Sequence, residues 1–110
     1  ESERMIVFIL STDCPACMEE LKQLQIIDDL VLSESFKVIA IFEEDYETVL
    51  GIFETFPNNI RIGYAGTDIF NALGVYAKPA MISIGSDHRI HDVTYGLTES
   101  SKIVSVISNM

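Results

Sequence analysis

The sequence predicts a single α/β domain, residues 1–110, with a central mixed β-sheet flanked by helices. Short apolar runs typical of buried strands alternate with helical patterns, in the order β-α-β-α-β-α-β-β-α. Strands joined through helices run parallel, whereas the last two strands follow one another directly and add an antiparallel pair. A length of 110 residues, of which 48% are hydrophobic, is sufficient for one folded core.

Two strands and the helix between them account for the first part of the chain. Met5–Leu10 is entirely apolar, as expected for a strand that is covered on both faces. The helix begins after Cys14, and spacings of three and four residues give it an apolar face formed by Leu21, Leu24, Ile27 and Val31. Phe36–Phe42 is the second predicted strand.

The middle of the chain predicts a helix, a weak strand and a short helix. The first helix has apolar residues at helical spacing and ends before Pro57; these residues are Tyr46, Val49, Leu50 and Phe53. Ile60–Ile62 is a weak, short strand. Thr67 or Asp68 can cap a short helix that extends to Leu73 and closes at Gly74.

A hairpin and a final helix complete the prediction. Ala80–Ile84 and Ile90–Tyr95 are strands joined through a turn at Gly85-Ser86-Asp87. Thr98 is the expected N-cap of the last helix, whose apolar residues are Ile103, Val104 and Ile107.

The charge of the chain excludes two classes of partner. The formal net charge is −10, which repels nucleic-acid phosphates and anionic membrane surfaces. No apolar run approaches the roughly 20 residues of a membrane-spanning helix. The chain opens with Glu1-Ser2-Glu3 and without an initiator Met, which predicts a fragment or mature form. Membrane contact is therefore expected only through an N-terminal anchor outside this sequence.

The two cysteines form the motif Cys14-Pro15-Ala16-Cys17 between a buried strand and an amphipathic helix. This context favours redox chemistry over a structural role as small buried side chains or an inert disulfide. Unpaired N–H groups and the helix dipole at a helix N-terminus favour a thiolate. We expect Cys14 to attack a partner disulfide and Cys17, one turn into the helix and more shielded, to resolve the mixed disulfide.

Around these motifs the sequence resembles the thioredoxin superfamily, from Met5 to about Ile107. Gly74-Val75-Tyr76-Ala77-Lys78-Pro79-Ala80 is similar to the family segment Gly-Val-x-x-x-Pro-Thr, whose proline is cis and faces the dithiol. The resemblance implies that Lys78 and Pro79 contact an extended substrate segment. It implies a partner protein that carries a disulfide or dithiol, a thiol electron donor, and a monomer without a cofactor.

Two features are similar to the bacterial TlpA/ResA-like branch. An extra α/β insert fits in the long stretch between Cys17 and Pro79, and Glu20 matches the branch pattern Cys-x-x-Cys-x-x-Glu. The resemblance implies a reductase of protein disulfides outside the cytoplasm, in the periplasm or cell envelope, with Glu20 tuning the cysteines. Glu20 could equally be an ordinary solvated acid on the helix face.

The sequence departs from the family next to the nucleophile. Asp13 stands where relatives usually have Trp, and an acid there disfavours the Cys14 thiolate. Phe8 occupies the place of the buried acid of simple thioredoxins. Lys78 replaces the commoner Val, Ile or Thr, and its ammonium could oppose Asp13 if it leans toward Cys14.

Other functions stay open at this stage. The same fold could act as a thiol oxidase or isomerase, or as a binding module that holds Cu(I) between Cys14 and Cys17; peroxide reduction is a minor alternative. No other metal site is predicted, because odd spacing sends His88 and His91 to opposite strand faces. The acidic run at Glu43, Glu44, Asp45 and Glu47 is interpreted as complementing a helix dipole.

Overall fold

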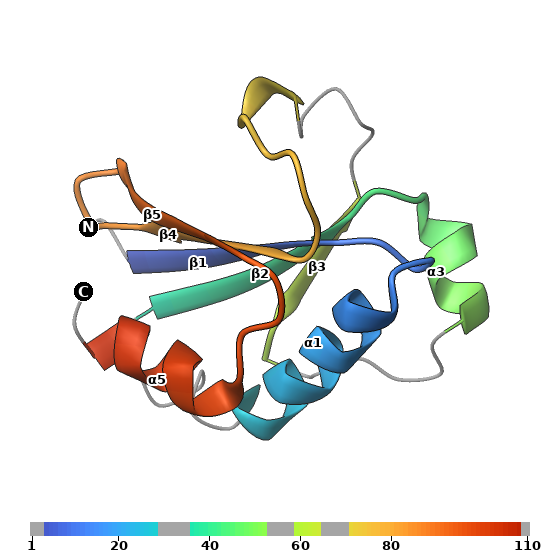
Figure 1. The fold of residues 1–110 in the computed structure, drawn as a ribbon, viewed down its shortest axis with the longest axis horizontal. Helices are drawn as coiled ribbons and strands as arrows, with labels where there is room; N and C mark the ends of the chain where they lie inside the picture. Colours follow the sequence, from blue (N-terminus) through green and yellow to red (C-terminus); the bar gives the residue numbers. More distant parts are fainter. Residues whose placement is uncertain (1–3, 29–35, 53–58, 65–70, 109–110) are drawn as a thin grey trace.

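The computed structural model describes residues 4–28, 36–52, 59–64 and 71–108. It contains a five-stranded sheet in the order β3-β2-β1-β4-β5 (Figure 1). The strands are β1 (Arg4–Leu10), β2 (Phe36–Phe42), β3 (Arg61–Tyr64), β4 (Ala80–Ile84) and β5 (Ile90–Tyr95). The helices are α1 (Pro15–Ile26), α3 (Tyr46–Ile52) and α5 (Ser100–Ser108). The predicted mixed sheet flanked by helices is confirmed.

The directions of the strands place the loops after β1 and β2 and the segment before β4 at one edge of the sheet. β1, β2 and β3 are parallel, whereas β4 is antiparallel to β1 and β5 to β4. The loops that follow β1 and β2 therefore lie at the same edge as the segment that enters β4. The pairing of β1 with β2 continues beyond the strands, because the Glu43 N–H donates to the Leu10 carbonyl at 3.1 Å.

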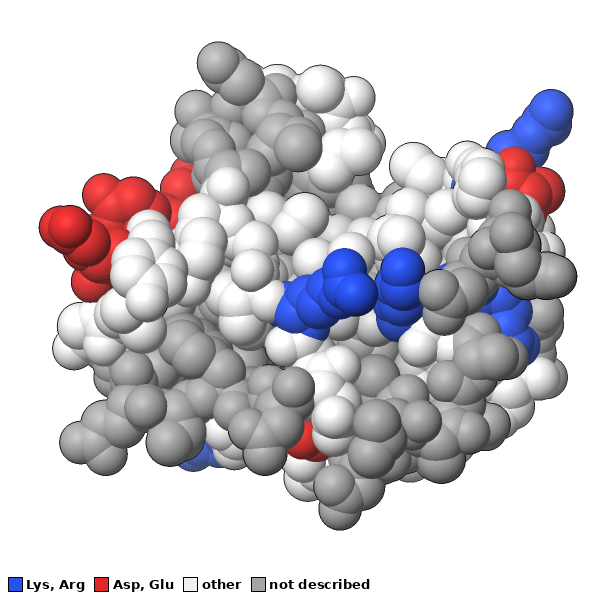
Figure 2. Space-filling view, turned by 180° about the vertical axis from the view of Figure 1, so that it is seen from behind, with Lys and Arg blue, Asp and Glu red and all other residues white. Residues whose placement is uncertain are grey.

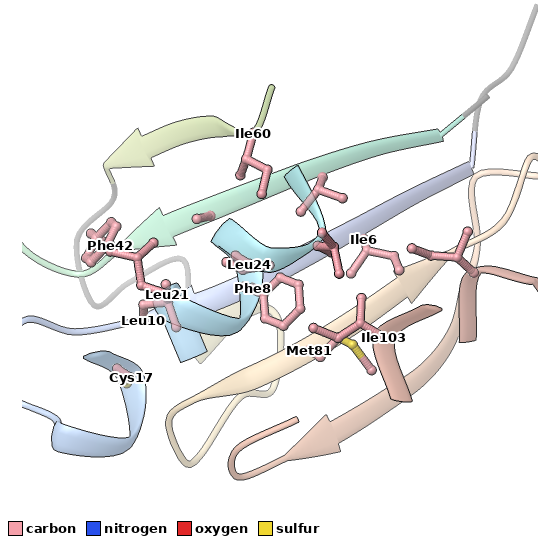
Figure 3. Close-up of a cluster of buried hydrophobic side chains, with 14 of the residues drawn as sticks. Ile6, Phe8, Leu10, Cys17, Leu21, Leu24, Phe42, Ile60, Met81 and Ile103 are labelled. Carbon is pink, nitrogen blue, oxygen red and sulfur yellow. The ribbon is translucent and has the colours of Figure 1, made fainter. Parts of the chain in front are cut away.

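Helices α1 and α5 lie together on one face of the sheet (Figure 1). The main core fills the space between them and this face. Figure 3 shows the alternate residues of β1 that contribute to it, Ile6, Phe8 and Leu10, all of them fully buried. Cys17 belongs to the same cluster, so the start of α1 is anchored in the core.

The opposite face of the sheet carries a smaller apolar cluster. Its buried members are Val7, Ile9, Val75, Ala80 and Ile82. β1 contributes to both clusters because successive side chains point to opposite faces of a strand. This explains why an entirely apolar run forms the central strand, as the sequence predicts.

The basic and acidic side chains have different distributions on the surface. In Figure 2, seen from behind, Lys and Arg side chains form a row across the middle of the molecule, and acidic side chains gather at the side where α3 lies. No helix within the described part of the chain is long and apolar enough to cross a membrane.

Several element boundaries differ from the sequence prediction. The weak strand expected at Ile60–Ile62 is found at Arg61–Tyr64, where it pairs with β2. The additional α/β pair between the helix that follows the dithiol and Pro79 corresponds to α3 and β3. Residues 67–70 of the predicted short helix, together with Val31, Phe53 and Pro57, lie outside the described residues.

The predicted N-cap at Thr98 is wrong. α5 begins at Ser100, and the first helical bonds inside it are accepted by the Glu99 carbonyl, from Lys102 and Ile103. The Thr98 hydroxyl makes no hydrogen bond within the described residues, and the residue is buried. Thr98 therefore makes no capping bond through its side chain, and its backbone N–H is bonded to the Glu20 side chain of α1.

Candidate functional site

Cys14 is the N-cap of α1, at the point where the chain turns from β1 into the helix. Its backbone is extended, with φ −112° and ψ 109°, and Pro15 occupies the first helical turn. The Cys14 sulfur accepts a hydrogen bond from the Cys17 N–H at 3.2 Å. A sulfur in this position takes the place of the capping oxygen, and the N–H bond and helix dipole both favour negative charge on it.

The two thiols differ in exposure as the sequence predicts. Both cysteines are free; Cys14 is partly exposed and Cys17 is fully buried. Burial raises the pKa of the Cys17 thiol to about 12, and the hydrogen bond to Cys14 adds to this effect. Cys17 is therefore a protonated thiol at neutral pH, shielded from a partner, and Cys14 is the sulfur that a partner can reach.

The Lys78–Pro79 segment lies directly against the dithiol. The Lys78 carbonyl oxygen is 3.9 Å from the Cys14 sulfur, at the distance of a weak thiol hydrogen bond. The peptide bond between Lys78 and Pro79 is cis. The Pro79 carbonyl accepts a 2.8 Å hydrogen bond from Gly96, which has a φ of 88° and follows β5. The structure thus brings Cys14, Cys17, Lys78 and Pro79 together at one edge of the sheet.

Glu20 lies one turn beyond Cys17 on α1 and is completely buried. Its Oε1 accepts a 2.7 Å hydrogen bond from the Thr98 N–H, whereas Oε2 has no partner within the described residues. Burial raises the pKa of Glu20 to about 7, although the Thr98 hydrogen bond acts in the opposite direction. The interpretation of Glu20 as a solvated surface acid is therefore wrong.

Lys78 has a different partner from the one that the sequence suggests. Its ammonium forms an ion pair with Glu43, and both side chains are about three-quarters buried, with exposures of 28% and 25%. Burial lowers the pKa of Lys78, but the hydrogen bond and charge of Glu43 outweigh this effect, so that the net shift is upward. The ammonium does not stand free beside the thiol.

Polar residues before the dithiol form a second group that sequence reasoning missed. The Ser11 hydroxyl is 2.5 Å from Asp13 Oδ1 and 2.7 Å from Glu44 Oε2, and the Thr12 N–H donates to Glu44 Oε1 at 3.1 Å. Burial raises the pKa of Glu44, but the hydrogen bonds from Ser11 and Thr12 lower it by more than burial raises it. The net shift of this pKa is therefore downward. The carboxyl ends of the parallel strands β1 and β2 lie at the same edge of the sheet. The acidic run that follows β2 could therefore have predicted that acidic side chains lie near the turn that follows β1.

The histidines lie away from this site. His91 and His88 belong to the β4–β5 hairpin and are exposed, and His91 Nε2 is 3.0 Å from Asp87 Oδ1. No group of three or more His, Cys, Asp or Glu side chains within the described ranges could hold a metal ion.

Solved structures provide the comparison, because no protein-family model and no curated protein matches the sequence. StoA from Bacillus subtilis is 18% identical, with a TM-score of 0.79 over 96% of this chain and 82% of that one. The exposed lipoprotein thioredoxin Etrx1 from Streptococcus pneumoniae is 11% identical, with a TM-score of 0.85 over 99% and 86%. A secreted disulfide oxidoreductase from Mycobacterium tuberculosis is 12% identical, with a TM-score of 0.82 over 98% and 82%. These likenesses, together with the strand order, show that the chain has the thioredoxin fold.

Proposed function

We propose that this protein is a thiol–disulfide oxidoreductase that reduces disulfides in partner proteins. The observation that carries the proposal is the pairing of a partly exposed Cys14 sulfur at a helix N-terminus with a buried Cys17 thiol one turn later. Nucleophile and resolving thiol need this arrangement, because the first must reach a partner and the second must not.

The reaction follows from the positions of the two sulfurs. The Cys14 thiolate attacks one sulfur of a partner disulfide, a new S–S bond forms, and the other partner sulfur leaves as a thiolate. Cys17 then loses its proton and attacks the Cys14 sulfur, which releases the second partner sulfur and closes the Cys14–Cys17 disulfide. Two electrons pass to the partner, and a separate thiol donor must return the protein to the dithiol form.

Three features of the site support the reductase direction. Burial opposes a thiolate at Cys17, and Asp13 and Glu44 add negative charge near the turn before Cys14. Strongly oxidising dithiols owe their potential to a stabilised reduced form. These three features offset the stabilisation that the helix N-terminus gives to a Cys14 thiolate, so the disulfide is held more firmly and the dithiol donates electrons more readily.

Glu20, Lys78 and Pro79 complete the proposed site. The Lys78 backbone, which lies against Cys14, is the proposed contact for an extended substrate segment, and Pro79 holds the loop through Gly96. Glu20 is proposed to disfavour negative charge at the dithiol when it is itself ionised. We place the protein outside the cytoplasm, since two similar structures are described as an exposed lipoprotein and a secreted enzyme.

The test uses reduced protein and a disulfide-bonded reporter peptide. We expect Cys14→Ser to abolish reduction and Cys17→Ser to accumulate a mixed disulfide with the peptide. The potential of the wild-type dithiol should lie near the −270 mV of thioredoxin, and a value of about −120 mV would instead identify an oxidant. If a limiting dose of alkylating reagent labels Cys17 before Cys14, the roles assigned to the two sulfurs are wrong.

A further inference from the structure

The acidic run after β2 has a role that a helix dipole does not explain. Asp45 does serve α3, because its carboxylate accepts the Thr48 N–H at 2.9 Å and its carbonyl accepts the Val49 N–H. Glu47 is in the first turn of the same helix. Glu43 and Glu44 precede the helix, and their side chains bond to residues beside the dithiol instead.

The position of Glu43 gives its ion pair an unusual path. Glu43 directly follows β2, whereas Lys78 lies just before β4. β1 is the strand between β2 and β4, so the ion pair must span the end of β1, where the chain turns toward Cys14. The Glu43 backbone is fixed there by its bond to Leu10, and only the side chain crosses to Lys78.

Lys78 lies beside the dithiol, because its carbonyl oxygen is 3.9 Å from the Cys14 sulfur. Burial is the main cause of the raised pKa of Cys17, and the positive charge of Lys78 opposes that rise. In turn, the charges that act on Lys78 are those of Glu43, Asp13 and Cys17. An ammonium in this place can stabilise a thiolate, and a carboxylate bound to the ammonium reduces that stabilisation.

We propose that Glu43 is a positioning residue that governs the dithiol through Lys78. Its carboxylate holds the ammonium in an ion pair across the end of β1 and withholds that positive charge from the cysteine sulfurs. Glu43 thereby keeps the fraction of thiolate at the dithiol low and keeps the dithiol reducing. The Glu43–Lys78 ion pair therefore controls how reactive the dithiol is. The inference deepens the proposed function and rests on it for the identity of the reacting sulfurs.

A double-mutant cycle separates this role from simple charge repulsion. Glu43→Gln, Lys78→Met and the double variant are reduced, and the iodoacetamide alkylation rate at pH 7 and the thiolate absorbance against pH are measured. Glu43→Gln should raise the alkylation rate roughly threefold, which is the effect of lowering the thiol pKa by about half a unit. Lys78→Met should lower the alkylation rate. Adding Glu43→Gln to Lys78→Met should change nothing further.

Controls and contrary outcomes are built into the same measurement. Glu47→Gln removes an exposed carboxylate of the same acidic run and should leave the alkylation rate unchanged. An equal rise for Glu43→Gln with and without Lys78 would show direct repulsion and overturn the proposal, as would no rise in either background. Alkylation requires no disulfide partner, so a protein that obeys this cycle but fails to reduce the reporter peptide would refute the proposed function alone.

Discussion

Glu20 is a carboxyl group in a place where its charge is costly. It is completely buried, only one of its oxygens has a hydrogen bond within the described residues, and its pKa is raised to about 7, chiefly by burial. The bond to the Thr98 N–H holds the segment before α5 against α1. Two residues earlier, Gly96 is bonded to Pro79, so this buried acid is connected to the loop beside the dithiol.

At this residue we predict that the Glu20→Gln variant gains stability relative to wild type as the pH rises. The folded-state pKa of about 7 lies above the ordinary value of 4.5, so the native protein holds this proton more tightly than the unfolded chain does. Wild type therefore loses stability between about pH 4.5 and pH 7, and the glutamine, which can still accept the Thr98 N–H, does not. The difference should grow by about 3 kcal/mol across that range.

Urea unfolding of both reduced proteins at pH 4.5 and pH 8 measures this difference. Comparing the variant with wild type cancels the other titrating groups. If the unfolding free energies of the two proteins changed equally with pH, ionisation of Glu20 would not destabilise the folded protein, and the prediction would be wrong.

At the scale of elements, the N-terminus of α1 determines what Cys14 can do. The helix starts at Pro15, and the Cys14 sulfur caps it through the Cys17 N–H. The same geometry that satisfies a helix end therefore places the Cys14 sulfur beside the Cys17 backbone. α1 is in turn held by its buried residues and by the Gln23 side chain, which accepts the Ser100 N–H of α5 at 2.8 Å.

We predict that Cys14→Ser is more stable than Cys14→Ala by about 1 kcal/mol. Serine supplies an oxygen that can accept the Cys17 N–H, whereas alanine leaves that N–H without its cap. Urea unfolding under reducing conditions measures the difference. At Cys17, which is fully buried in the core, the order should reverse, because a serine there buries a hydroxyl group. Equal stability of the two Cys14 variants would show that the sulfur cap contributes nothing.

At the scale of the whole molecule, acidic residues follow the strand ends that lie beside the dithiol. Arg4, Lys37 and Arg61 lie at the amino-terminal ends of the three parallel strands. Asp13, Glu43, Glu44 and Asp45 follow the carboxyl ends of β1 and β2. Lys78, the cation at this end, is already paired with Glu43. The dithiol end is therefore negative within a chain of net charge −10.

This polarity predicts a preference for partners with positive charge near their disulfide. We expect a disulfide reporter peptide flanked by lysines to be reduced several times faster than one flanked by glutamates, at low ionic strength. The ratio should fall as salt is added, because the screening length is only about 10 Å at 0.1 M. Rates compared over a salt series test this, and a faster reaction of the acidic peptide, or a ratio unaffected by salt, would contradict it.

The sequence by itself determined the parts of this protein that depend on local patterns. The apolar run of β1, the alternation of strands and helices, and the position of Cys14 and Cys17 at a helix start all follow from the spacing of residues close together in the chain. Burial of Cys17 also follows, because it lies one turn into a helix whose face packs on the sheet.

Only the tertiary structure decided which distant residues meet. The sequence left Glu20 between a tuning acid and a solvated one, and its burial depends on the Thr98 segment from the far end of the chain. It assigned Glu43 to a helix dipole, yet Glu43 meets Lys78 across β1 because the strand order places β1 between them. Thr98 was misassigned because α5 begins two residues later, at Ser100, and the Thr98 hydroxyl makes no capping bond within the described residues. Local spacing fixes where a side chain stands on its own element, whereas its charge state and partner depend on how the elements pack.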